Sequence, residues 1–228
     1  MSDTEDRIYE LRFYNVAPGR DADMRSRVQN DLAWLFPRHG IRPIAGWSAI
    51  SAQSLPMFIY ITQWRNMIER NRHWAGFYAD PDWQEVRNRT NRGSELVEDY
   101  EIFFLREMSP WLQLASTGNE LDELVIHHTL VGKGLAVANA LRERELPALE
   151  KNGARVQGAF DVMSGCRLPA AITVLRWQDF AARREAERLL SSDQQLQQAR
   201  ASDRELFNAN LIGHSSSFLL EPVPVDWQ

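Results

Sequence analysis

Residues 8–16 alternate between apolar and polar positions with a period of two, and this alternation predicts a strand with two different faces. One face is apolar. The other combines charge with an aromatic ring, in the order Glu10, Arg12 and Tyr14. Because such a face is poorly suited to simple solvation, we expect these three side chains to meet in a confined space.

The hydrophobic pattern predicts a β-α-β-β-α-β order in the first half, over residues 8–16, 21–37, 44–50, 57–64, 66–78, 80–91 and 96–106. Pro37 and Gly40 predict the end of the first helix, and Asp80 followed by Pro81 predicts a helix start. The second half predicts the same order, over residues 121–131, 135–152, two paired strands, 180–190, 193–207 and 211–220.

The two halves are related by an ungapped repeat. Residues His39–Met67 match Asn152–Phe180 at a constant offset, 153 − 40 = 113. The identical pairs are Gly40 and Gly153, Arg42 and Arg155, Ser51 and Ser164, Leu55-Pro56 and Leu168-Pro169, Ile59 and Ile172, and Trp64 and Trp177. The repeat predicts an α+β protein of two tandem ferredoxin-like units, whose bare sheet faces pair to close one barrel within the chain.

The same pattern predicts the domain boundaries. We expect domains at 7–108 and 121–221, joined by a linker at 109–120 that contains Pro, Ser, Gly and Asn. Residues 222–228 are spaced by prolines and predict an extended tail on the surface.

Composition narrows the class of partner. The 228 residues carry a net charge of −5 with both signs interspersed, which argues against nucleic acid and against an anionic membrane as partners. The single cysteine, Cys166, excludes an intrachain disulfide. The sequence lacks a signal peptide pattern and an apolar run of about 18 residues, so we expect a cytoplasmic protein.

Several short motifs in the first half resemble the NIPSNAP family. They are the opening strand Tyr9-Glu10-Leu11-Arg12-Phe13-Tyr14, the turn Pro18-Gly19, His39-Gly40, Gly46-Trp47, Trp64 and Asp80-Pro81-Asp82-Trp83. The second half looks like a diverged copy. It keeps a family-like helix end from Glu145 to Gly153, but its first strand differs from the family pattern.

This resemblance implies the dimeric α/β-barrel superfamily, whose members include haem-degrading and cofactor-free monooxygenases, chlorite dismutases and muconolactone isomerases. Haem is therefore a candidate cofactor. The NIPSNAP family itself has no generally assigned reaction, and some members are associated with protein interaction. A non-enzymatic interaction module is thus the alternative to a small-molecule enzyme, and a homodimer is an open option.

All five tyrosines and most tryptophans lie in the first half. Rings with polar tips suit a pocket for a flat apolar ligand, so we place the small-molecule site there, with Tyr60, Trp47, Trp64 and Glu10 binding the ligand. The alternative is that these rings have a structural role and fill the hydrophobic core. Arg12 and Tyr14 would then form an internal polar cluster instead of catalytic groups.

Histidines supply the other candidates. His73, on the second predicted helix, lies in a region from which related barrels present a histidine, and it is a candidate general base or axial ligand, or else a surface histidine. His127 and His128 are adjacent on a strand and point to opposite faces, so they cannot easily share a metal ion. His127 could meet Asp161 or His214 and bind a ligand, but no zinc motif supports a metal site.

Overall fold

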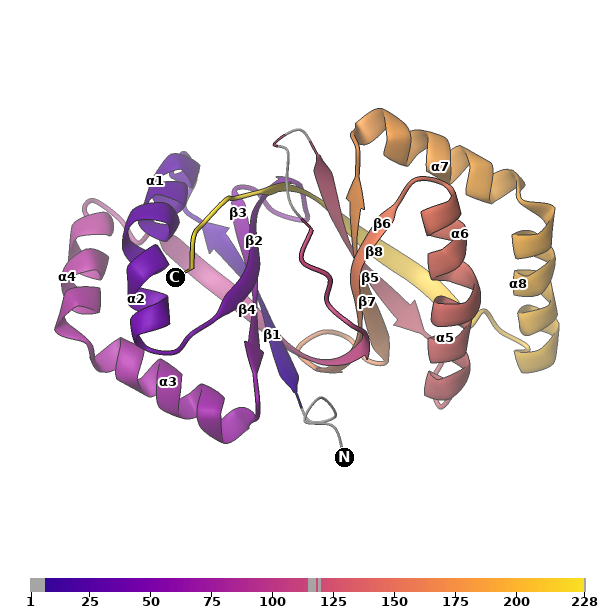
Figure 1. Cartoon of the computed structure of the whole chain (residues 1–228), viewed down its shortest axis with the longest axis horizontal. Coiled ribbons are helices and arrows are strands. Elements are labelled where there is room, and N and C mark those ends of the chain that lie inside the picture. Colours follow the sequence, from indigo (N-terminus) through magenta and orange to yellow (C-terminus); the bar gives the residue numbers. More distant parts are fainter. Residues whose placement is uncertain (1–6, 115–117, 119, 228) are drawn as a thin grey trace. The chain divides into compact units, whose positions relative to one another are not determined.

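The computed structural model describes residues 7–114, 118 and 120–227, which form two compact units (Figure 1). The first unit runs to Arg106 and includes the end of the chain from Glu221, and the second unit runs from Glu107 to Leu220. In each unit, the helices lie on one face of a four-stranded antiparallel sheet. This is the ferredoxin-like α+β arrangement.

The first unit contains β1 (Ile8–Val16), α1 (Asp21–Ser26), η1 (Arg27–Leu32), α2 (Ala33–Arg38), β2 (Pro43–Ser51), β3 (Met57–Trp64), α3 (Met67–Ala79), α4 (Pro81–Thr90) and β4 (Val97–Ser109). The helix predicted from Asp21 is one continuous run whose middle turn, η1, is π-helical. It ends at Arg38, and Gly40 takes the positive φ of 67° that a chain reversal requires.

The second unit contains β5 (Leu121–Thr129), α5 (Gly134–Ala140), η2 (Leu141–Glu145), α6 (Leu146–Lys151), β6 (Arg155–Ser164), β7 (Ala170–Trp177), α7 (Phe180–Ser192), α8 (Gln194–Phe207) and β8 (Ile212–Pro222). The element order is that of the first unit, including the π-helical turn.

The sheet register repeats with the sequence offset. Arg12 lies opposite Tyr60 on the pair β1 and β3, and Val125 lies opposite Thr173 on the pair β5 and β7. The strand order is β4-β1-β3-β2 in the first unit and β8-β5-β7-β6 in the second. Residues that are 113 positions apart in the sequence therefore occupy matching positions in the two sheets.

The helix starts also repeat. Asp80 accepts a hydrogen bond from the backbone N–H of Asp82 at 2.8 Å, and Asp193 accepts one from Leu196 at 3.0 Å. These caps satisfy backbone donors that a helix leaves unpaired at its N-terminus. The predicted helix start at Asp80 is confirmed.

The end of the chain packs differently from the expected surface tail. Val223 is 5% exposed and donates its backbone N–H to the Gly46 carbonyl at 2.9 Å. Trp227 stacks on Phe36, with ring centroids 5.8 Å apart. Apolar residues at every second position give the extended tail one apolar side, and that side joins the core of the first unit.

Part of the predicted linker also packs on a sheet. Leu112 donates its backbone N–H to the Gln157 carbonyl at 2.7 Å, within the second unit. Residues 115–117 and 119 of that linker lie outside the described residues.

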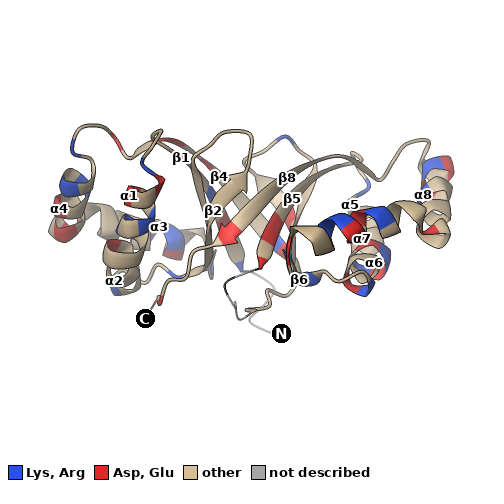
Figure 2. Cartoon of the chain, turned by 90° about the horizontal axis from the view of Figure 1, so that it is seen from above, with Lys and Arg blue, Asp and Glu red and all other residues tan. Residues whose placement is uncertain are grey.

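Basic and acidic residues occur together on the helices of both units (Figure 2). No described helix is long and apolar enough to cross a membrane.

Candidate functional site

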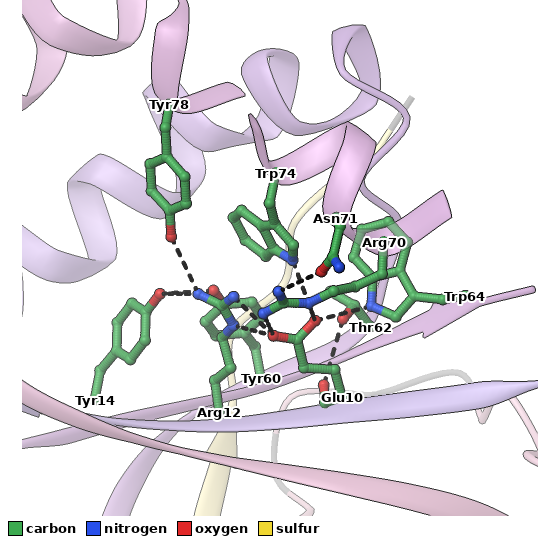
Figure 3. Close-up of polar contacts among 10 residues, drawn as sticks. All are labelled: Glu10, Arg12, Tyr14, Tyr60, Thr62, Trp64, Arg70, Asn71, Trp74 and Tyr78. Atoms are coloured by element: carbon green, nitrogen blue, oxygen red, sulfur yellow. Dashed lines mark hydrogen bonds and ion pairs between the residues drawn. The ribbon is translucent and has the colours of Figure 1, made fainter. Parts of the chain in front are cut away.

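Glu10 is the centre of a polar cluster on the helix-facing side of β1 (Figure 3). It is completely buried. Its carboxylate accepts hydrogen bonds from Arg12 at 2.8 Å, from Arg70 at 2.7 and 3.1 Å, and from the indole N–H groups of Trp64 and Trp74 at 2.9 and 3.1 Å. Burial alone would raise the pKa of Glu10, but the hydrogen bonds and charges of the two arginines lower it.

Arg12 lies next to Glu10 and is 2% exposed. Its guanidinium stacks 3.8 Å from the centre of the Trp74 ring and donates to the hydroxyls of Tyr14 at 3.0 Å and Tyr78 at 3.5 Å. Burial alone would lower the pKa of Arg12, but the oxygens of Tyr60, Tyr14 and Glu10 raise it. Arg12 is therefore a permanent cation in the centre of the unit.

Two of the predicted pocket tyrosines close this cluster. The hydroxyls of Tyr14 and Tyr60 are 2.8 Å apart, and burial raises the pKa of both, so both stay protonated at neutral pH. Phe36 and Phe77 pack against Trp74 at ring distances of 5.6 and 5.7 Å. The predicted residues Glu10, Arg12, Tyr14, Tyr60 and Trp64 are thus brought together, but side chains occupy the space between them.

Of the other two first-half candidates, Trp47 lies on the opposite sheet face and His73 borders the cluster through Trp64. Trp47 pairs with Ile59 on the neighbouring strand, which puts it on the sheet face opposite to Tyr60. His73 stacks on Trp64 at 6.0 Å, and its Nδ1 atom contacts the backbone carbonyl of His39. His73 therefore joins α3 to the end of α2, and its roles as base or axial ligand stay predictions.

The second unit repeats the centre of the cluster. Glu123, 4% exposed, accepts hydrogen bonds from Trp177 at 2.9 Å, from Arg183 at 2.8 Å and from Ser217 at 2.5 Å. Glu123, Trp177 and Arg183 stand at the positions of Glu10, Trp64 and Arg70, 113 residues later.

A cavity of about 640 Å³ lies beside Glu123, between the sheet and the helices of the second unit. Its apolar walls include Leu141, Leu146, Leu149, Leu175, Leu211 and Ile212. This volume lies within the range of about 300–1,000 Å³ of small-molecule sites. The sequence analysis predicts the small-molecule site in the first half, whereas this cavity lies in the second unit.

Small side chains open this cavity. At the offset of 113, the residues that fill the first unit change as follows: Arg12 to Val125, Tyr14 to His127, Tyr60 to Thr173, Trp74 to Glu187 and Tyr78 to Ser191. All five replacements line the cavity. The sequence signal for this cavity is the loss of side-chain volume at these positions, not the aromatic content of the first half.

His127 lies on the cavity wall between two hydroxyls. Its Nδ1 atom is 3.0 Å from the Ser215 hydroxyl, and its Nε2 atom is 3.0 Å from the Thr173 hydroxyl. Burial lowers the pKa of His127 from 6.5 to about 4, although Glu145 and Glu123 act in the opposite direction. A neutral imidazole donates from one nitrogen and accepts at the other, so it orients both hydroxyls.

The predicted partner Asp161 is exposed and is not among the residues that line the cavity. Within the described residues, no group of three or more His, Cys, Asp or Glu side chains is arranged to hold a metal ion.

The cavity offers one candidate axial ligand for haem. His127 is the one histidine among the lining residues that the structure describes, and hydroxyls engage both of its ring nitrogens. An axial nitrogen would have to give up one of these hydrogen bonds.

An ion-pair network forms another part of the wall and was missed by the sequence analysis. Glu145, 8% exposed, is bound by Arg200 at 2.5 Å and by Arg144 at 3.1 Å, and Arg144 also binds Asp203 at 2.6 Å. These residues come from η2 and α8, whose relative placement the periodicity does not specify.

The fold defines the class of this protein. Both units are ferredoxin-like α+β units, and the chain is similar in fold to dimeric α/β-barrel proteins. The NIPSNAP family model matches residues 9–110, so the first unit is a NIPSNAP domain, as its motifs indicated. No protein of curated function matches the chain.

Three solved structures show this likeness over almost the whole chain. A proposed monooxygenase from Fusobacterium nucleatum superposes with a TM-score of 0.61 at 8% identity, over 96% of this chain and 93% of that chain. An anthrone oxidase-like protein gives 0.60 at 13% identity, over 98% and 94%. A mutant chlorite dismutase from Candidatus Nitrospira defluvii gives 0.55 at 9% identity, over 96% and 93%. At these identities the likeness shows the fold alone.

Proposed function

We propose that the protein binds and transforms a small, mainly apolar or aromatic molecule in the cavity of the second unit. The observation that carries this proposal is the replacement of a ring-filled core by a cavity of about 640 Å³ at equivalent positions of the same frame. A packed core needs no such opening, because unfilled volume between sheet and helices lowers stability.

The polar groups of the cavity suit a ligand with one hydroxyl or carbonyl group. His127, Thr173 and Ser215 form a hydrogen-bonded row that can donate to such a group or accept from it. The surrounding leucines give the cavity an apolar wall beside this row. The names of two structural neighbours, a proposed monooxygenase and an anthrone oxidase-like protein, make oxidation by O₂ the first reaction to test.

Replacing Thr173 by tyrosine tests the site. Tyrosine stands at the equivalent position of the first unit, where its ring fills the same space. We expect Thr173→Tyr to weaken binding of the neutral fluorescent probe N-phenyl-1-naphthylamine at least about tenfold, without a large loss of stability because the ring enters open volume. Fluorescence titration measures the first effect and thermal unfolding the second.

Ser192→Tyr is the matched control. It adds the same ring to the same unit, at an exposed position that does not line the cavity. We expect it to bind the probe like the wild type. Failure of the wild type to bind the probe, or equal binding by Thr173→Tyr, would exclude the cavity as the site. Effort would then move to partner capture, since a protein-interaction module is the alternative function.

The intrachain pairing of the two sheets stays a prediction. Its support is the apolar sheet face away from the helices, which carries Leu11 and Phe13 in the first unit. A single compact body of 228 residues has a radius of gyration of about 17 Å. Small-angle scattering of the monomer is expected to give this value. A value several ångströms larger would indicate two separate units, and a doubled mass would indicate a homodimer.

A further inference from the structure

We propose that the molecule bound in the second unit is a monocarboxylate, and that Arg204 holds its carboxylate at the α8 end of the cavity. This inference rests on the proposed function, because it specifies the ligand of the same cavity. The residues that carry it are the charged side chains of the cavity wall.

Most of these charges are already paired. Arg144, Arg200, Glu145 and Asp203 form one network of two cations and two anions. The network is neutral as a whole. A ligand charge would have to break an existing ion pair to bind there.

Glu123, Arg183 and Glu187 form a second charged group of the lining. Arg183 lies 2.8 Å from Glu123 and 3.5 Å from Glu187. This group has a net negative charge, so it repels an anion. A carboxylate is therefore disfavoured beside Glu123.

Arg204 is the exception. Its Nε atom donates to the neutral side chain of Asn210 at 2.9 Å. Over the part of the chain that the structure describes, Arg204 forms no ion pair, although it lines the cavity. Its Nη atoms are a planar pair of donors suited to bind a carboxylate in a bidentate manner. Its single positive charge matches one carboxylate, and the lining as a whole, with four arginines and four acidic residues, has no excess of positive charge to hold a doubly charged phosphate.

The rest of the lining fits an apolar body behind that carboxylate. Leu211 and Ile212 follow Asn210 directly and line the cavity, and Ser215, five residues after Asn210, contacts His127. A ligand whose carboxylate binds Arg204 can therefore place its apolar part against these walls.

The test compares 1-naphthaleneacetic acid with 1-naphthaleneacetamide as competitors of N-phenyl-1-naphthylamine. The two competitors share a ring system and differ in charge. We expect the wild type to bind the acid severalfold more tightly than the amide at low ionic strength, and salt to reduce this preference because Arg204 is exposed. Arg204→Gln is expected to abolish the preference for the acid over the amide.

Arg188→Gln is the matched control, because it removes an arginine of α7 that is paired with Glu185 and does not line the cavity. It is expected to keep the preference for the acid. Equal competition by acid and amide in the wild type, or a preference that survives Arg204→Gln, overturns the carboxylate assignment while the proposed function stands. A wild type that fails to bind the probe itself overturns the proposed function.

Discussion

Replacing Glu10 by glutamine is expected to lower the thermal midpoint of the protein by on the order of 10 °C at pH 7. Glu10 compensates two arginines, Arg12 and Arg70, and Arg12 is 2% exposed. The neutral amide leaves Arg12 buried without a counter-charge, and removal of one partner of a buried pair costs about 3–5 kcal/mol. Circular dichroism during heating measures the shift.

Glu123→Gln is the matched comparison, since Glu123 occupies the position of Glu10 in the second unit. Its cationic partner is Arg183, whose side chain is 20% exposed at the cavity. Water can solvate Arg183 after the change, so we expect less than half of the loss seen for Glu10→Gln. Equal losses of stability in the two variants would mean that leaving Arg12 and Arg70 without Glu10 costs no more than leaving Arg183 without Glu123.

The comparison of Glu10→Gln with Glu123→Gln also bears on whether the first unit holds a ligand site or an internal polar cluster. Arg12 and Tyr14 were predicted to be catalytic, and Tyr60 to bind ligand. Their buried contacts with one another favour the alternative that the sequence left open, an internal polar cluster. Those roles stay untested, but any substitution of Arg12 is expected to disturb folding before it reports on binding.

Much of the fold could be predicted because its signals are local. The two-residue period of β1 separates Glu10, Arg12 and Tyr14 from the opposite face, and the structure places all three towards the helices. Asp80 before Pro81 marks a helix start through a side-chain cap. The offset of 113 predicts the register between Val125 and Thr173 once that between Arg12 and Tyr60 is known.

The cavity could not be located by the same means. Periodicity tells which face a side chain occupies, but not whether the volumes from a sheet and several helices add up to a filled space. Trp74 and Glu187 occupy equivalent helix positions. Their difference in size has an effect only through residues distant in the sequence, such as Thr173 and Val125. The aromatic excess of the first half predicts a pocket there, whereas the buried rings of that half, Phe36 and Trp74 among them, pack against one another.

His127 gives the second large effect, a pH dependence with a definite sign. Burial lowers its pKa from 6.5 to about 4 in the folded protein. Between these values the unfolded chain binds a proton and the folded protein does not, so the free energy of unfolding falls as the pH falls. The loss from His127 is about 2 kcal/mol between pH 7 and pH 5.

Comparing the wild type with His127→Gln isolates this contribution. Glutamine can still hydrogen-bond to Thr173 and Ser215 but does not titrate, so the variant is expected to lose about 2 kcal/mol less over the same interval. Urea unfolding followed at both pH values measures the difference, and NMR titration of the His127 ring gives its pKa directly. Parallel pH profiles for the two proteins, or a ring pKa near 6.5, would mean that water reaches the imidazole freely. The wall of the cavity at His127 would then be hydrated, which disfavours binding of an apolar ligand there.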